Sequence, residues 1–270
     1  MPPAKKRLRK YDSAKTRAAV LAQAGHVRDA VSALPPEVLA RPTRLGGWTV
    51  RELVAHLTMV LASLSRKLAE PEPARHELAL LDWPLATASG AAGIDEDTRA
   101  LAAEDDLVGD PAGAYERTRA VFEERLAGAS DERLVPTRFG AMRLGDFLVT
   151  RTVELVVHTD DLNAATGPDV PDVPFDRQAL AACTRLLADA LAAKAPGGAV
   201  EVRVPPYAVV QCVEGPRHTR GTPPNVVETD PLTWVRLATG RTDWAAELDA
   251  ARVSASGERA DLGGLLPLMG

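Results

Sequence analysis

The sequence is poor in aromatic residues, in long apolar runs and in excess basic charge. Aromatic residues make up only 4% of the 270 residues, so the core must be mainly aliphatic, which suits helix packing more than a β-sandwich. No apolar run approaches the ~18–20 residues that a membrane span requires, so no membrane span is expected. The net charge of −5 and the pI of about 5.6 argue against a nucleic-acid partner, because such partners are usually met by a basic face.

Cysteine is also scarce, and the N-terminus lacks a targeting pattern. Cys183 and Cys212 lie far apart without a metal-type spacing, and both are expected to be small buried hydrophobic residues in a reducing compartment. The N-terminus has no apolar segment followed by a cleavage site, so a cytoplasmic protein is expected. The basic run at residues 5–10 fits either an arm for an anionic surface or a solvated tail. Because nothing aromatic or amphipathic accompanies this run, residues 1–12 are predicted to be a disordered basic tail.

The first half of the chain has the pattern of a helical bundle. Apolar residues repeat at three- and four-residue steps, and the helix ends carry signals such as the Thr49-x-x-Glu52 capping box. The predicted helices cover residues 13–33, 49–70, 111–126 and 144–166. Residues 71–110 are rich in Pro, Gly, Ala and acidic residues, and we expect a long loop there with a short helix near residues 96–103. Long loops in compact domains are often functional, so substrate contacts are expected in this segment.

The period of the apolar residues changes after a segment at residues 168–175 that holds three prolines and two aspartates, which indicates a domain boundary. The pattern beyond it predicts helices at residues 176–194, 230–238, 243–250 and 262–268, and strands at 200–204, 207–213, 226–229 and 252–256. The sequence therefore predicts an α+β protein of two domains, a bundle at residues 13–170 and a smaller α+β domain at residues 175–270.

The helix predicted at residues 144–166 carries an unusual stripe of ionisable residues. Arg151, Glu154, His158 and Asp161 follow one another at steps of three and four residues, and leucines and valines cover much of the remaining surface. The helix is therefore expected to be central, with these groups facing inward. Burying an unpaired charge is costly, so the groups must pair, form hydrogen bonds or hold a metal.

Two of these residues have the spacing of metal ligands. Glu154 and His158 are four residues apart, so both can reach one ion from adjacent turns, and imidazole with carboxylate suits zinc and similar metals. His56, at the edge of the apolar stripe of the second helix, is the best candidate for a third ligand. Taken alone, the spacing also fits a Glu–His pair satisfied within the core, and His56 also fits a core-edge histidine.

Two motifs resemble a known family. The stretch from Gly47 to Leu57 resembles the first metal motif of DinB-like bundles, and in particular the N-terminal domain of mycothiol-dependent maleylpyruvate isomerases. The stretch from Val153 to Gly167 resembles the second motif of that family. The resemblance covers about residues 13–167 and implies a four-helix bundle with a divalent metal, usually zinc, on His56, Glu154 and His158. It further implies that the thiol of mycothiol occupies the open coordination position and is the nucleophile.

The C-terminal part, about residues 175–270, resembles the bacterial sterol-carrier-protein-like domain. The resemblance is carried by residues 200–215, 219–224, 230–241 and 252–258. It implies either a tunnel for an apolar ligand or a domain that packs on the bundle and helps to enclose its site. Arg217, His218 and Arg220 form a basic cluster that fits an anionic substrate or a solvated turn equally well. Arg151 fits three roles: orienting Glu154, binding an anionic group, or forming an ion pair with Asp161 or Glu154.

The leading hypothesis is a divalent-metal-dependent isomerase or transferase that uses a low-molecular-weight thiol on a small electrophilic substrate. The alternative is a non-catalytic carrier of lipid or another apolar ligand with a structural metal site, and a metal-binding structural protein without turnover is also open. The expected partners are a small-molecule substrate and the thiol, and the chain fits a monomer or a homodimer.

Overall fold

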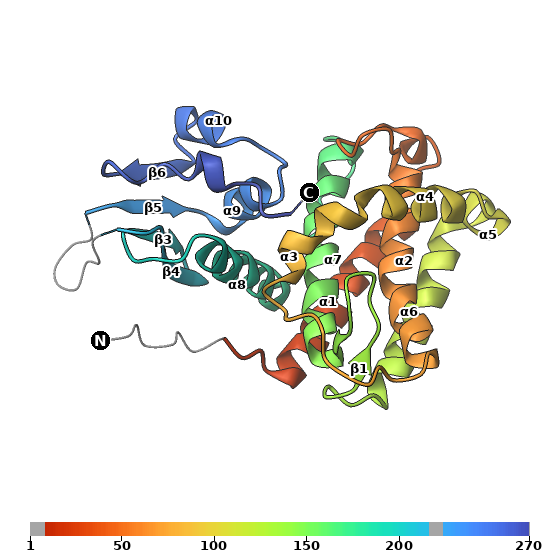
Figure 1. Ribbon diagram of the computed structural model, residues 1–270. Helices are drawn as coiled ribbons and strands as arrows, with labels where there is room; N and C mark the ends of the chain where they lie inside the picture. The colour runs from red at the N-terminus through yellow and green to blue at the C-terminus, as the bar shows by residue number, and fades with distance from the viewer. Residues whose placement is uncertain (1–8, 216–223, 270) are drawn as a thin grey trace.

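The protein has two regions, a helical bundle and a sheet flanked by helices, in a computed structural model that describes residues 9–215 and 224–269. The predicted α+β class with two domains is confirmed. In Figure 1 the bundle lies on the right and the sheet on the left. The basic cluster Arg217, His218 and Arg220, and most of the predicted N-terminal tail, lie outside the described residues. Within the described ranges, no helix is both long and apolar enough to span a membrane.

Four long helices form the bundle, and each lies within two residues of its predicted range. They pack in a ring in which α1 and α2 each contact both α6 and α7. The helices are α1 (Ser13–Ala33), α2 (Val50–Ala69), α6 (Pro111–Ala127) and α7 (Leu144–Thr166). The capping box is present, since the backbone N–H of Thr49 donates to Glu52 Oε2 at 2.8 Å. Gly167, with φ of +75°, ends α7.

The segment at residues 71–110 is not a long loop, and that prediction is wrong. It contains α3 (Trp83–Ala86), α4 (Ala91–Ala102) and α5 (Asp105–Gly109), with a 3₁₀ turn at Thr87–Gly90. The expected short helix is the second half of α4. A small cluster, in which Ala102 and Leu107 pack with Ala55 of α2 and Ala114 of α6, holds this segment on the bundle. Alanines at such a contact allow close approach but give a weak sequence signal, so packing rather than local pattern stabilises these helices.

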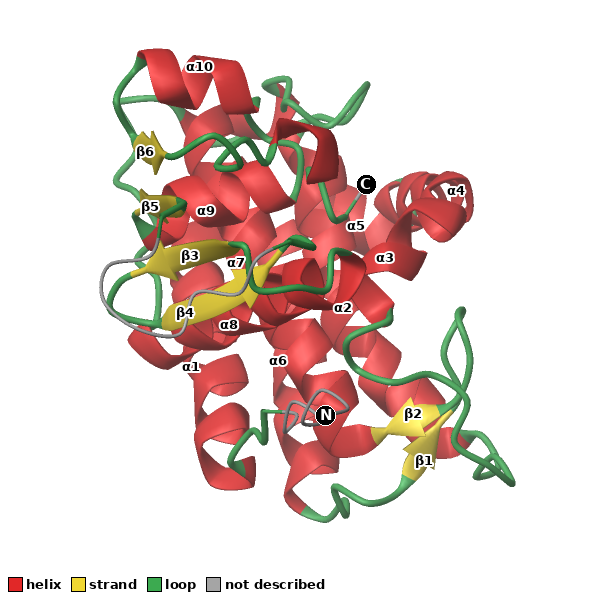
Figure 2. Cartoon of the chain, turned by 60° about the vertical axis from the view of Figure 1, so that its left-hand side comes forward, coloured by secondary structure: helices red, strands yellow, loops and turns green. Residues whose placement is uncertain are grey.

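A 3₁₀ turn and a pair of very short strands lie between the long helices of the bundle. A 3₁₀ turn covers Val38–Ala40. The two-residue strands β1 (Leu134–Val135) and β2 (Met142–Arg143) pair antiparallel and lie well apart from the main sheet (Figure 2). Neither strand was predicted, because two residues cannot establish an alternating pattern.

The C-terminal region is a four-stranded sheet with helices. Its order is β4-β3-β5-β6, in which β3 and β5 are parallel and the other neighbours are antiparallel. The elements are α8 (Arg177–Lys194), β3 (Val200–Val204), β4 (Ala208–Cys212), β5 (Val226–Thr229), α9 (Pro231–Ala238), α10 (Trp244–Asp249) and β6 (Val253–Ser256). The helix predicted at residues 262–268 is only a 3₁₀ turn at Gly263–Leu265, because Pro267 forces Leu266 into an extended conformation.

Helix α8 joins the two regions. It contacts α1 and α7 on one side and β4 and α9 on the other, and Figure 1 shows it between the sheet and the bundle. The inward residues of β3 and β4 are buried, Cys212 among them, while Glu201 and Arg203 alternate with them on the outer face. One continuous apolar core therefore runs from the bundle through α8, with its buried Cys183, into the sheet.

Candidate functional site

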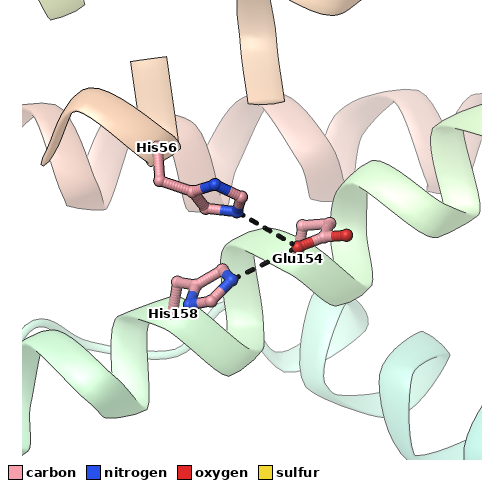
Figure 3. Close-up of side chains that lie close together, drawn as sticks. All are labelled: His56, Glu154 and His158. Atoms are coloured by element: carbon pink, nitrogen blue, oxygen red, sulfur yellow. Dashed lines mark ion pairs between the residues drawn. The ribbon is translucent and has the colours of Figure 1, made fainter. Parts of the chain in front are cut away.

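Helices α2 and α7 bring His56, Glu154 and His158 together, as the motif spacing predicted (Figure 3). One potential ligand atom from each residue lies within 4.8 Å of the other two. Glu154 Oε2 is 3.5 Å from His56 Nε2 and 3.3 Å from His158 Nε2. The two imidazole rings are 4.5 Å apart and inclined at 74°, so both ring edges converge on the carboxylate.

The local structure explains why these polar groups face inward. Helix α7 is buried around most of its circumference, with Leu155 and Val156 fully enclosed, so Glu154 and His158 cannot reach bulk water freely. His56 follows the buried stripe of α2 and is 5% exposed. Three ionisable side chains thus meet inside the bundle, where isolated charges are expensive and mutual compensation is required.

The outer nitrogens of both imidazoles already have partners. His158 Nδ1 lies 2.8 Å from Asp161 Oδ2, and His56 Nδ1 lies 3.3 Å from Thr98 Oγ1. With the proton on Nδ1 of each ring, each Nε2 lone pair faces Glu154, which is the arrangement that a metal between these side chains would need. His56 Nε2 is buried and has no hydrogen-bond partner among residues 9–215 and 224–269. Two imidazole nitrogens and a carboxylate oxygen form a donor set that suits a divalent first-row metal, so the residues fit the ion that the family implies.

The environment sets the charge of each group. Burial lowers the pKa of His56, which keeps this imidazole neutral near pH 7. Burial alone would raise the pKa of Glu154, but the neighbouring imidazoles of His158 and His56 and the charge of Arg151 hold it well below its usual range. Burial likewise opposes a charge on His158, yet the hydrogen bonds to Asp161 and Glu154 raise its pKa. The centre therefore contains an ionised carboxylate that attracts cations.

The three residues line a pocket of about 560 Å³. Trp48, Trp83, Phe139 and Phe147 also line it, in a chain that has only four tryptophans and four phenylalanines. Such a concentration of aromatic surface beside polar groups is typical of a small-molecule site. Asp95 and Asp97 of α4 contribute as well, so the segment at residues 71–110 forms part of the pocket wall.

Arg151 lies in the wall of this pocket, and its positive charge is only weakly compensated by a carboxylate. Its guanidinium stacks over the Phe147 ring at 4.6 Å, and its Nη2 is 3.8 Å from Glu154 Oε1, which is too long for a hydrogen bond. The ion pair with Asp161 that we considered is not formed; Asp161 pairs with His158, Arg44 and Arg241. Lys67, which the sequence did not single out, lies over the same ring at 5.9 Å from its centre, and burial and Arg151 lower its pKa.

Several site residues have no signal in the sequence. Thr98 lies within the short helix expected near residues 96–103, but nothing in that segment marks it as a partner of His56. Trp48, inside the first motif, packs its ring 5.2 Å from that of His56. Arg241 and Met269 reach the pocket from the C-terminal region. The pocket is therefore built by both regions, which spacing along either one alone could not reveal.

Comparison with known proteins identifies both regions. Residues 20–163 match the family model of the mycothiol maleylpyruvate isomerase N-terminal domain, and residues 176–268 match that of the bacterial SCP ortholog. A search among curated protein sequences gave no significant match.

Solved structures share the whole fold. The crystal structure of the mycothiol-dependent maleylpyruvate isomerase matches with a TM-score of 0.61 and 15% sequence identity, over 96% of this chain and 97% of that one. A histidine-to-alanine mutant of that isomerase matches with the same TM-score and coverage at 16% identity. At such identities the likeness establishes the fold, and it confirms the resemblance recognised in the two motifs.

Proposed function

The chain belongs to the family of the mycothiol maleylpyruvate isomerase N-terminal domain, and on that basis we propose that it is a divalent-metal-dependent enzyme that uses a low-molecular-weight thiol of the mycothiol type on a small electrophile. The observation that carries the proposal is the unsatisfied His56 Nε2, which faces Glu154 beside His158 in the wall of an aromatic-lined pocket. An orphaned buried nitrogen is costly in the core and is satisfied if it binds a cation.

His56, Glu154 and His158 would hold the metal, with zinc as the first candidate from the donor set. Three protein ligands leave an open position, which is typical of catalytic rather than structural zinc. A metal held there lowers the pKa of a coordinated thiol, so that a thiolate is available at neutral pH. With Asp161 and Thr98 as partners, Nδ1 of each imidazole can carry the proton, which would leave both Nε2 lone pairs for the metal.

Arg151 and Lys67 would receive an anionic group of the electrophile. Both cations border the pocket and lie over the Phe147 ring, and within the described part of the chain the distant Glu154 is the only carboxylate paired with Arg151. A buried, incompletely paired guanidinium binds a carboxylate more strongly than an exposed one, because little water competes. Arg217 and Arg220 stay candidates for the same role on the sequence alone.

Elemental analysis of the purified protein tests the metal site. The wild type should contain near-stoichiometric zinc or a similar divalent metal, and His158→Ala should lose it. His26→Ala is the matched control, because His26 contacts Pro174 O at 3.1 Å and lies outside the donor set. Absence of metal from the wild type after reconstitution would rule out the proposal. With metal present, consumption of the thiol during turnover distinguishes a transferase from an isomerase, which regenerates it.

A carrier function would use a different part of the chain. A pocket of about 490 Å³ between α9, α10 and the C-terminal segment is lined by Leu237, Trp244 and Leu266 among others. The sheet itself leaves little room, because Trp234 and α8 fill its apolar face. Binding of a fluorescent fatty acid by the full chain, lost in Trp244→Ala and unaffected by a metal chelator, would support this alternative.

A further inference from the structure

Two adjacent aspartates on α7 carry buried charges beyond the donor set. Asp160 and Asp161 are 2% and 0% exposed. Asp161 accepts from Arg44 Nε at 2.7 Å and Arg241 Nη2 at 3.0 Å, in addition to its contact with His158. Asp160 accepts from Arg236 Nη2 at 2.6 Å and Nε at 2.9 Å, and also from Arg44. Of the two aspartates, only Asp161 contacts a residue of the donor set, namely His158. Arg236 and Arg241 belong to the C-terminal region.

The end of α9 delivers both arginines. Gly240 has φ of +69°, and the backbone N–H of Arg241 donates to Arg236 O at 2.8 Å, which is the pattern of a Schellman cap. The turn ends the helix, and the two arginines on either side of it reach the adjacent carboxylates of Asp160 and Asp161. Arg241 Nη1 donates to Thr239 O at 2.6 Å, which fixes the guanidinium before it reaches Asp161.

The contact between Asp161 and His158 determines the direction of the His158 lone pair. A carboxylate that accepts from Nδ1 holds the ring in one orientation and leaves Nε2 free for a metal. Asp161 can hold that ring only if its own position is fixed, and the arginines from two separate chain segments fix it. Without Arg241, one of the three groups that orient the carboxylate is removed, while Arg44 still compensates its charge.

We propose that Arg241 is a positioning residue: through Asp161 it holds the His158 ring in the orientation that metal binding requires, so the C-terminal region controls metal affinity in the bundle. The inference rests on the proposed metal function. Arg236, which binds Asp160 in the same interface, attaches the C-terminal region to α7 without contacting a residue that touches the donor set. The two arginines thus separate positioning of the site from attachment of the region.

Competition between the metal-free protein and a chromophoric chelator for Co²⁺ and Zn²⁺ tests this separation. Loss of such an outer partner typically weakens metal binding about 10–100-fold, so Arg241→Met should weaken it at least about 10-fold. Arg241→Lys should recover part of the loss, and the visible bands of bound Co²⁺ should shift in Arg241→Met. Arg236→Met is the matched control, with an affinity within about twofold of the wild type, since its partner Asp160 contacts no metal ligand.

The melting temperature of each metal-free variant separates positioning from stability. Similar melting temperatures for Arg241→Met and Arg236→Met, with different metal affinities, would support the inference. Equal affinities for Arg241→Met and the wild type would overturn it, and so would an equal loss in both variants, because attachment alone would then be the cause. If the wild type itself binds neither metal, the proposed metal function fails and the inference fails with it.

Discussion

The two regions of the molecule treat charged residues in opposite ways. The bundle buries His56, Glu154, His158 and Asp161 along the contact of two helices. The sheet of the C-terminal region keeps its charges on its outer face, where Arg203 pairs with Glu201 at 2.7 Å. Since exposed pairs contribute little to stability and buried charges cost much, the bundle carries groups that the fold alone does not need.

Buried polar groups in the C-terminal region serve its own backbone. Asn225 donates to Ala199 O at 2.8 Å, and Thr229 donates to Arg252 O at 2.8 Å, so both connect strands to neighbouring segments. Glu247, only 3% exposed, is satisfied by Thr242 and Arg252. Thr184 Oγ1 of α8 is buried without a partner among the described residues, as His56 Nε2 is, but only at His56 do other potential metal ligands converge on the unsatisfied atom. The difference teaches that an unsatisfied buried atom points to a site when further ligand atoms face it.

The largest effect on the free energy of unfolding should come from a substitution in the core that both regions share. Trp234 is buried and its indole N–H donates to Thr184 O of α8 at 3.3 Å, so Trp234→Ala should destabilise the protein by about 3–5 kcal/mol. Urea unfolding followed by circular dichroism measures this loss. Val209→Ala, at a side chain that is 60% exposed, should change stability by less than about 0.5 kcal/mol. Unfolding of the two regions at separate urea concentrations would break the comparison, since it would mean that α8 does not couple them.

The sequence predicted the bundle, and the proximity of His56, Glu154 and His158, because the helical pattern and the two family-like motifs each lie in a short stretch. Helix α7 has a continuous apolar pattern, a glycine-proline stop and a Glu154–His158 spacing within one turn, and all of these can be read from a short window. The contact between Arg241 and Asp161 joins residues 80 positions apart in different regions, so no spacing rule could reveal it. The first half of α4 was missed for a related reason, because the helix is stabilised by packing on α2.

Metal binding should stabilise the bundle through its donor set alone. At a free metal concentration of 100–1,000 times the dissociation constant, the wild type should gain about 3–4 kcal/mol in the free energy of unfolding. His56→Ala should lose most of this gain, because it removes one of the three convergent donors. Glu247→Gln, at the buried carboxylate of the C-terminal region, should retain it. Urea unfolding at increasing metal concentrations measures this gain for both variants. A gain in His56→Ala equal to that of the wild type would show that the ion binds elsewhere.

The pH dependence of stability should also separate the two regions. Burial would raise the pKa of Asp161, but the hydrogen bond and charge of His158, together with Arg241, lower it below its usual value. A carboxyl group with a depressed pKa stabilises the fold above its unfolded pKa of about 3.9, and that stability is lost as the pH falls toward the folded pKa. Unfolding of the metal-free protein between neutral and acid pH should therefore show a steep loss below about pH 4, and Asp161→Asn should flatten it.

Glu247 gives the matching measurement in the C-terminal region. The hydrogen bond from Arg252 lowers the pKa of Glu247, but Arg252 is 54% exposed, so solvent screens the pair. Glu247→Gln should therefore change the loss of stability at acid pH less than Asp161→Asn does. An equal change in both variants would mean that burial of the Asp161 network adds nothing to its electrostatic strength.

The smallest effects should come from two glycines, with opposite signs. Gly240 has φ of +69° in the turn that presents Arg241, so Gly240→Ala should cost about 1 kcal/mol and also weaken metal binding through Arg241. Gly25 lies within α1, and the position that a β-carbon would occupy is open space. Gly25→Ala should therefore stabilise the protein by about 0.5–1 kcal/mol without altering metal affinity. Thermal unfolding and chelator competition on both variants measure the two quantities separately. Because Gly240 lies in the other region from the donor set, a weaker metal affinity in Gly240→Ala alone would tie that affinity to the geometry of the α9 turn.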